Sequence, residues 1–177
     1  MHPSQVIDFW TEAGPERWFA KSAEFDAAIT QRFFGLHEAA ARGDFDWAGA
    51  PAGALALILL LDQFPRNMFR DSPRAFATDA KAVALAESAI ARGFDAKYAP
   101  PLRRFFYLPF MHAEDLGRQR RCEALCAAAG DDDGVKFAVL HREIIERFGR
   151  FPHRNPILGR ATTAEEQAFL DAGGFSG

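Results

Sequence analysis

The sequence GALALILLLDQFPRNMFR (residues 53–70) decides the fold of this chain. It joins a long apolar run to a proline and then to a cluster of polar residues. The apolar run extends from Ala48 to Leu61, which is shorter than the roughly 18–20 residues that span a bilayer. Pro51 can occupy the first position of a helix, where its missing N–H leaves no bond unmade. The stretch therefore predicts a buried central helix that breaks at Pro65 and does not cross a membrane.

Helical spacing continues on both sides of this stretch. Two series of apolar residues recur every three or four positions: Phe25, Ile29, Phe33, Leu36 and Ala40, and later Phe137, Leu140, Ile144, Phe148 and Phe151. Each series predicts one apolar helix face, and no segment shows the alternation of a strand. We predict an all-α fold of about seven to nine helices in antiparallel hairpins, forming one domain over residues 1–177.

Composition narrows the function classes. The chain has 177 residues with 49 % hydrophobic content, so it can bury a core. A net charge of −3 argues against a nucleic-acid binder, which would normally carry a basic face. The two cysteines, Cys122 and Cys126, provide no disulfide framework and are expected to pack in the core. Without a visible signal peptide, the sequence indicates a cytoplasmic protein.

The informative feature is a recurring proline break. Residues 64–67 read Phe-Pro-Arg-Asn, and residues 151–155 read Phe-Pro-His-Arg-Asn. A third break, residues 107–115, reads Tyr-Leu-Pro-Phe-Met-His-Ala-Glu-Asp. A proline inside a helix removes one N–H and clashes with the carbonyl four residues earlier, so each break should free carbonyl groups. Arginine and asparagine side chains can donate to such groups.

A functional interpretation places the three breaks around one concave site. Residues 141–160 hold five Arg and two His against two Glu, a basic segment in an acidic protein. Arginine and asparagine beside helix ends suit a small anion or a carboxylate. The candidate ligand-binding residues are Asp62, Gln63, Arg66, Asn67, His112, Glu114, Asp115, His141, Arg150, His153, Arg154 and Asn155.

A structural interpretation competes with it. The same polar residues could tie off kinked helix ends, and His141, four residues from Phe137, could be a satisfied core histidine. His37, four residues after Phe33, has the same pattern.

Other chemistries lack their usual motifs. The ligand types in His112-x-Glu114 and His141-x-Glu143 do not have the spacing of known metal motifs, so we expect no metal. Glycine-rich phosphate loops and a Gly-x-Ser-x-Gly elbow are absent, which leaves no predicted cofactor and no obvious nucleophile.

Five blocks together resemble the bacterial domain-of-unknown-function family 924: residues 6–10, 53–70, 76–79, 107–115 and 141–160. The LDQFPRN and RFGRFPHRN segments are the most specific of them. The resemblance implies a tetratricopeptide-like superhelix, in which stacked antiparallel helix pairs leave a concave face. It implies no activity and no catalytic residues. One departure is Ala113, where the family pattern leads us to expect a serine.

Three hypotheses follow. The first is a binding module whose concave face holds a small anionic ligand or a peptide through its Arg, His and Asn side chains. The second is an enzyme in which His112 or His141 acts as general base, oriented by Asp62, Glu114 or Asp115. The third is a purely structural or protein-interaction role, which is favoured if every arginine of the blocks pairs with a carboxylate or a helix-end carbonyl. The oligomeric state is not predicted.

Overall fold

The computed structural model describes residues 2–175. Its α-helices are α1 (Pro3–Ala13), α2 (Pro15–Trp18), α3 (Ala23–Arg42), α4 (Pro51–Ile58), α5 (Phe64–Met68), α6 (Asp79–Ala91), α7 (Leu108–Met111), α8 (Leu116–Ala128), α9 (Asp132–Phe148) and α10 (Ala164–Asp171). Short 3₁₀ segments are η1 (Trp47–Gly49), η3 (Pro73–Phe76), η4 (Asp95–Lys97), η5 (Leu102–Phe106) and η6 (Pro152–Arg154), while η2 (Leu59–Gln63) is a π-helix. Within residues 2–175 there is no strand, so the predicted all-α class is confirmed.

The ends of the helices follow local chemistry. Ser22 caps the start of α3, where its side chain accepts a hydrogen bond from the Phe25 N–H. At α10 the cap is Thr163, whose side chain and that of Glu166 form a reciprocal capping box. Gly43 and Gly149 end α3 and α9 in the left-handed conformation that glycine adopts without strain.

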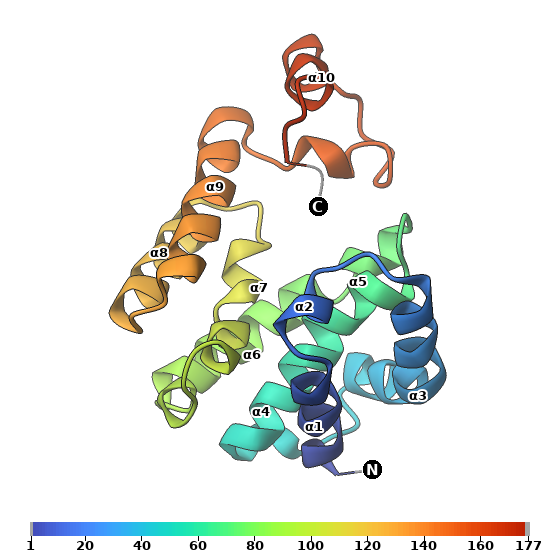
Figure 1. Ribbon diagram of the computed structural model, residues 1–177, viewed down its shortest axis with the longest axis vertical. Helices are drawn as coiled ribbons and strands as arrows, with labels where there is room; N and C mark the ends of the chain where they lie inside the picture. The colour runs from blue at the N-terminus through green and yellow to red at the C-terminus, as the bar shows by residue number, and fades with distance from the viewer. Residues whose placement is uncertain (1, 176–177) are drawn as a thin grey trace.

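The central segment forms the core, as the apolar run predicts. Every residue of 53–65 is buried, and α4 packs against α1 and α6 while η2 and α5 pack against α3 (Figure 1). Gly53 lets this helix lie against η1, because an added Cβ would come within 1.9 Å of the Trp47 carbonyl oxygen. No helix in the described part of the chain is long and apolar enough to cross a membrane.

Helices α8 and α9 form an antiparallel pair on one side of this core (Figure 1). The predicted apolar face of α9 is partly wrong, because Phe137 and Leu140 are 50 % and 40 % exposed. The buried face instead runs through the small residues Gly134 and Ala138. A Cβ on Gly134 would meet Cys126 Sγ at 3.0 Å, so close approach to α8 selects this face and leaves the two larger side chains outside. Cys122 and Cys126 are buried, as predicted.

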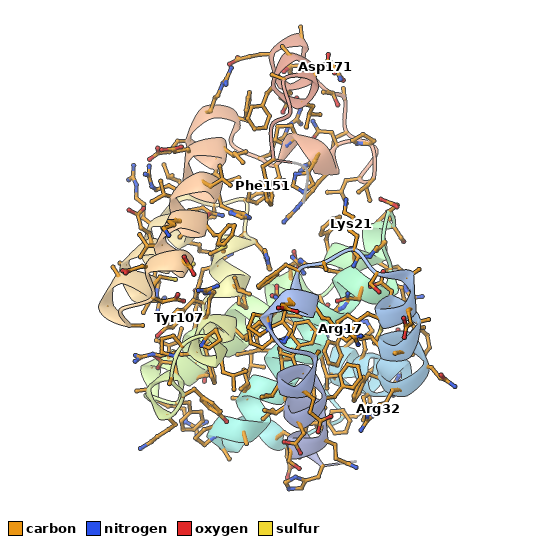
Figure 2. The ribbon with its side chains drawn as sticks, viewed as in Figure 1. Arg17, Lys21, Arg32, Tyr107, Phe151 and Asp171 are labelled. Atoms are coloured by element: carbon orange, nitrogen blue, oxygen red, sulfur yellow. The ribbon has the colours of Figure 1, made fainter. Side chains whose placement is uncertain are left out.

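The C-terminal segment packs on a second, smaller cluster of apolar side chains. Ile144, Ile145 and Phe151 form its buried part, and Phe148 and Phe169 pack against them. Figure 2 labels Phe151 where the chain leaves α9 for η6 and α10. Because η6 begins directly after Phe151, this cluster fixes the position of the polar residues in the proline break at residues 151–155.

Candidate functional site

The site begins with a distortion of the central helix. Pro65 has no N–H and would clash with the carbonyl of Leu61 in a regular helix. The chain avoids the clash with the π-turn η2, in which the Phe64 N–H donates to the Leu59 carbonyl. Such turns frequently occur at functional sites. Here the turn places Asp62 inside the protein, where its side chain is fully buried.

Side chains from three helices satisfy the carbonyl groups that this turn frees. His37 Nδ1 donates to the Leu60 carbonyl at 2.8 Å, and Thr78 Oγ1 donates to the Leu61 carbonyl at 2.6 Å. The Arg66 guanidinium donates to the carbonyl of Asp62. The structural interpretation of the first break is therefore supported for Arg66 and for His37.

The buried carboxylate of Asp62 is held by three side chains. His112 Nδ1 lies 2.9 and 3.0 Å from its two oxygens, and the Gln63 amide also donates to it. Arg66 Nη1 lies 3.4 Å away. Burial alone would raise the pKa of Asp62, but the charge and hydrogen bond of His112 and the charge of Arg66 outweigh it and lower that pKa to about 2. Asp62 is therefore an anion at neutral pH.

His112 is oriented by this carboxylate. An ionised carboxylate only accepts hydrogen bonds, so Nδ1 carries the proton and Nε2 carries the lone pair in the neutral ring. Burial and the charge of nearby Arg66 lower the pKa of His112, and together they outweigh the charge and hydrogen bond of Asp62 and the charge of Asp79, which act in the opposite direction. The histidine side chain is 15 % exposed, and Nε2 has no hydrogen-bond partner within residues 2–175.

Arg66 also connects the first break to α6. Its two terminal nitrogens donate to the two carboxylate oxygens of Asp79, each at 3.0 Å, in a bidentate pair. Asp79 stands in the first turn of α6. Burial alone would lower the pKa of Arg66, but Asp62 and Asp79 outweigh it and raise it. Every charge of the first break thus has a partner inside the protein.

Arg154 from η6 approaches the same carboxylate but is differently placed. Its Nη1 lies 4.0 Å from Asp79 Oδ2, and its side chain makes no hydrogen bond in the described structure. Arg154 is only 7 % exposed, and its Nε is buried without a partner. The guanidinium carbon lies 4.6 Å from the ring centre of Phe76 and 4.5 Å from that of Phe151. Burial, followed by the charge of Arg66, lowers the pKa of Arg154 to about 10.

A cleft of about 360 Å³ opens above these groups. His112 and Arg154 both line it, and so does Asp79. Apolar side chains, the three residues after His112 and one arginine of α8 complete its wall: Phe76, Ala80, Val83, Leu158, Ala113, Glu114, Asp115 and Arg118. One residue from each proline break therefore takes part in one connected cluster: Arg66 from the first, His112 from residues 107–115 and Arg154 from residues 151–155.

The remaining predicted residues lie elsewhere or have partners. Asn67 donates to Asp26, Arg150 forms a bidentate pair with Glu166, and Asn155 bridges Glu166 and Arg160. Glu114 accepts from Arg160 and from the Phe151 N–H. Asp115 caps α8 by accepting from the Arg118 N–H. These residues hold helix ends and loops together, as the structural interpretation expects.

The two other histidines do not face the cleft. His141 Nδ1 donates to the Phe137 carbonyl at 2.7 Å, and its ring packs against Phe151 and Phe175. His153 packs against the same two aromatic rings. Burial lowers the pKa of each of these histidines to about 4. Of the two histidines considered as a general base, only His112 has a carboxylate partner among residues 2–175.

Sequence reasoning missed two residues of the cluster. Asp79 joins Arg66 to Arg154, and Phe76 lies against both guanidinium groups, 5.8 Å from the Arg66 carbon. Both belong to the block of residues 76–79 that carries part of the family resemblance. The signal that could have found them is an aspartate in the first turn of a helix, three residues after the aromatic residue that ends a proline-opened turn.

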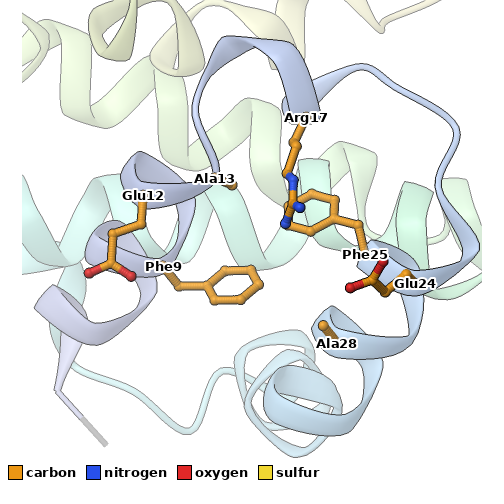
Figure 3. Close-up of a pocket in the computed structure, with 7 residues that line it drawn as sticks. All are labelled: Phe9, Glu12, Ala13, Arg17, Glu24, Phe25 and Ala28. Atoms are coloured by element: carbon orange, nitrogen blue, oxygen red, sulfur yellow. The ribbon is translucent and has the colours of Figure 1, made fainter.

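A second hollow of about 280 Å³ lies between α1, α2 and α3. Figure 3 shows Arg17 beside the ring of Phe25, between the carboxylates of Glu12 and Glu24. Arg17 and both glutamates are exposed to solvent, so this hollow holds no desolvated charge.

Within residues 2–175, no group of three or more His, Cys, Asp or Glu side chains could hold a metal ion.

Comparisons with known proteins agree with this architecture. The family model described as "Bacterial protein of unknown function (DUF924)" matches residues 6–174. A solved structure of the protein of unknown function ATU0120 from Agrobacterium tumefaciens has 48 % sequence identity and a TM-score of 0.93, covering 96 % of this chain and 97 % of that one. No curated protein matches this chain.

Proposed function

We propose, for a chain that belongs to the bacterial DUF924 family, that the cleft binds a small anion or a carboxylate-bearing ligand through Arg154. The observation that carries this proposal is an arginine that is only 7 % exposed, whose side chain makes no hydrogen bond within residues 2–175 and whose Nε is buried without a partner. Desolvating a cation is costly unless hydrogen bonds and an opposite charge compensate for it. Arg154 has only a 4.0 Å contact and two aromatic faces in compensation.

Arg154 differs from every other arginine in the five blocks that resemble the family. Each of them donates to a carboxylate: Arg66 to Asp79, Arg70 to Asp26, Arg142 to Glu123 and Glu146, Arg147 to Glu165, Arg150 to Glu166, and Arg160 to Glu114. Arg154 is the one arginine of residues 2–175 that is classed with the buried polar groups. A purely structural role explains the paired arginines but leaves the donors of Arg154 unused. An anion in the cleft would accept from them.

The geometry around Arg154 supports a small planar or tetrahedral anion. Both terminal nitrogens of Arg66 donate to Asp79, whereas Arg154 lies 4.0 Å from Asp79 Oδ2 without donating to it, so the donors of Arg154 stay available to a ligand. The rings of Phe76 and Phe151 lie against the guanidinium and limit its rotation, which preorganises its donors. The apolar wall of Val83, Ala80 and Leu158 favours a ligand with a short hydrocarbon part.

The test combines thermal unfolding and calorimetric titration. The wild-type protein is titrated with phosphate, acetate, propionate, lactate and a short carboxylate-terminated peptide at fixed ionic strength. An anion at about 100 times its dissociation constant adds roughly 2.7 kcal/mol, which raises the melting temperature by about 5–10 °C for a chain of this size. Arg154→Gln should abolish the shift. Arg32→Gln, which removes an exposed arginine over the rings of Phe9 and Phe33, is the matched control and should retain it.

Two results would count against the proposal. One is a panel in which no anion raises the melting temperature of the wild-type protein. The other is a shift that Arg154→Gln and Arg32→Gln reduce equally, which would indicate general charge screening. Either result would favour the structural or protein-interaction hypothesis.

Two broader expectations accompany the binding proposal. We infer that the helices stack as a tetratricopeptide-like superhelix in one domain, and two features support this: the antiparallel α8–α9 pair, and a main core whose buried members run from Val6 to Ala138. Limited proteolysis with mass spectrometry tests the single domain. Protection of residues 6–174 as one fragment would support it, whereas a stable fragment ending before α10 would contradict it.

A further inference from the structure

The cleft offers a hydrogen-bond acceptor as well as a cation. His112 and Arg154 line the same space. The lone pair of His112 lies on Nε2, because Nδ1 is engaged by Asp62. The other tautomer would set a lone pair on Nδ1 against the ionised carboxylate of Asp62, which has no proton to donate. The acceptor character of Nε2 is therefore fixed by a residue that the ligand does not touch.

Other acceptors around the cleft already have donors. Asp79 accepts two hydrogen bonds from Arg66, and Glu114 accepts from Arg160 and from the Phe151 N–H. Asp115 is occupied at the start of α8. Among the side chains that line the cleft, Arg154 is the buried cation and His112 Nε2 is the neutral acceptor without a partner, whereas the other acceptors are carboxylates; Arg118 lies at the exposed rim.

The charges of the cluster also balance before any ligand binds. Asp62 and Asp79 provide two negative charges, and Arg66 and Arg154 provide two positive charges. Any anion gives this buried group a net negative charge, and an anion without a proton would also set its own lone pairs against that of Nε2. An anion that brings its own proton meets Nε2 with a hydrogen bond instead of a repulsion.

We propose that the cleft selects a small anion that carries an O–H group, with the negative oxygen on Arg154 and the O–H donating to Nε2 of His112. This inference rests on the anion-binding function proposed above and names its ligand class. Two kinds of ligand combine a negative oxygen with an O–H group: a hydrogenphosphate group and a hydroxycarboxylate. A site built around a hydrogen bond to such a group discriminates strongly against the analogue that lacks it, because the buried partner is then left unpaired.

Two ligand pairs test the proposal by calorimetry at pH 7. Phosphate and sulfate have the same tetrahedral shape, but only phosphate retains a proton. Lactate and propionate differ by one hydroxyl group. We expect phosphate to bind more tightly than sulfate, or lactate more tightly than propionate, by at least about tenfold in dissociation constant. This ratio corresponds to the free energy of one hydrogen bond to a buried partner. The pair that shows the larger ratio identifies the source of the chemistry.

A single substitution should reverse the selection. In Asp62→Asn the amide NH₂ can donate to Nδ1, which moves the proton of His112 to Nε2 and turns the acceptor into a donor, as a carboxylate-to-amide change does in a catalytic triad. The ratio of the two dissociation constants within each pair should then fall to about one, or reverse so that sulfate and propionate bind more tightly. His112→Gln should reduce the ratio without this reversal. His153→Gln, which alters a histidine outside the cleft, should keep the wild-type ratio.

The outcomes separate the two proposals. If no anion binds, or if binding does not depend on Arg154, the anion-binding function fails. If anions bind through Arg154 but sulfate equals phosphate and propionate equals lactate, the anion-binding function stands and the inference about His112 is overturned. An unchanged preference in a folded Asp62→Asn protein, checked by its circular dichroism spectrum, would overturn it as well. ¹⁵N chemical shifts of the His112 ring give an independent readout, with an unprotonated Nε2 expected in the wild type.

Discussion

The breaks at Pro65 and Pro152 share a sequence pattern but differ in what their arginines do. Arg66 donates to its own turn and to Asp79, so its charge and its donors are satisfied inside the protein. Arg154 lies next to the same carboxylate without a hydrogen bond. The same Phe-Pro…Arg-Asn pattern therefore serves a structural role in one place and leaves a desolvated cation in the other. The tertiary partner decides which role the pattern has.

The largest expected effect comes from replacing each arginine by methionine. Arg66→Met would leave Asp79 and the Asp62 carbonyl without their donors, and breaking such a pair typically costs about 3 kcal/mol or more. Arg154→Met removes no hydrogen bond and relieves the desolvation of a cation, while it loses contacts with two aromatic rings. We expect its free energy of unfolding to stay within about 1 kcal/mol of the wild type.

Urea denaturation of the two variants measures this difference directly. Equal losses of stability would contradict the distinction between a paired and an unpaired arginine. A large loss for Arg154→Met alone would indicate that Arg154 stabilises the C-terminal segment through Phe76 and Phe151. Arg32→Gln again serves as a control for removal of an exposed cation.

The sequence predicted the class of the fold because its signals are local. Apolar spacing, Pro51 and the apolar run of residues 48–61 act within a few helical turns. The face of α9 was predicted wrongly because a count of apolar residues favours Phe137 and Leu140, whereas packing favours the close approach that Gly134 allows. Which face is buried depends on the shape of the neighbouring helix, which periodicity does not contain.

The candidate site was predictable only in part for a related reason. Asp62, Arg66, His112 and Arg154 could be named because each stands beside a proline break. Their partners could not be assigned, since the Asp62–His112 contact joins residues 50 positions apart. Asn155 could not be separated from Asn67 by pattern, although one bridges Glu166 and Arg160 and the other donates to Asp26.

The next prediction concerns acid, which should weaken the two breaks in different pH ranges. Burial lowers the pKa of His141, which packs against Phe151, to about 4. In the unfolded chain this histidine titrates near pH 6.5. Between these values the unfolded state binds more protons, so stability falls as the pH falls from about 6.5 towards 4. Asp62, whose pKa is lowered to about 2, contributes stability that is lost only below about pH 3.9.

The free energy of unfolding at pH 7.5 and pH 4.5 checks this order. His141→Gln should reduce the loss of stability between these two pH values by about 2–3 kcal/mol relative to the wild type. If His141→Gln retains the full wild-type loss, burial of this ring does not control the acid sensitivity of the second break.

The smallest expected effect concerns the π-turn, which only the first break possesses. Thr78 donates to the Leu61 carbonyl, which the turn frees from its helical partner. Thr78→Val should therefore leave a buried acceptor unpaired and cost about 1–2 kcal/mol in urea denaturation. Thr30→Val is the matched control, because Thr30 donates to the Asp26 carbonyl inside the regular helix α3, where the backbone already supplies a donor. Its cost should stay below about 0.5 kcal/mol. Equal costs for the two variants would mean that the freed carbonyl does not depend on Thr78, and the first break would then hold its π-turn by packing alone.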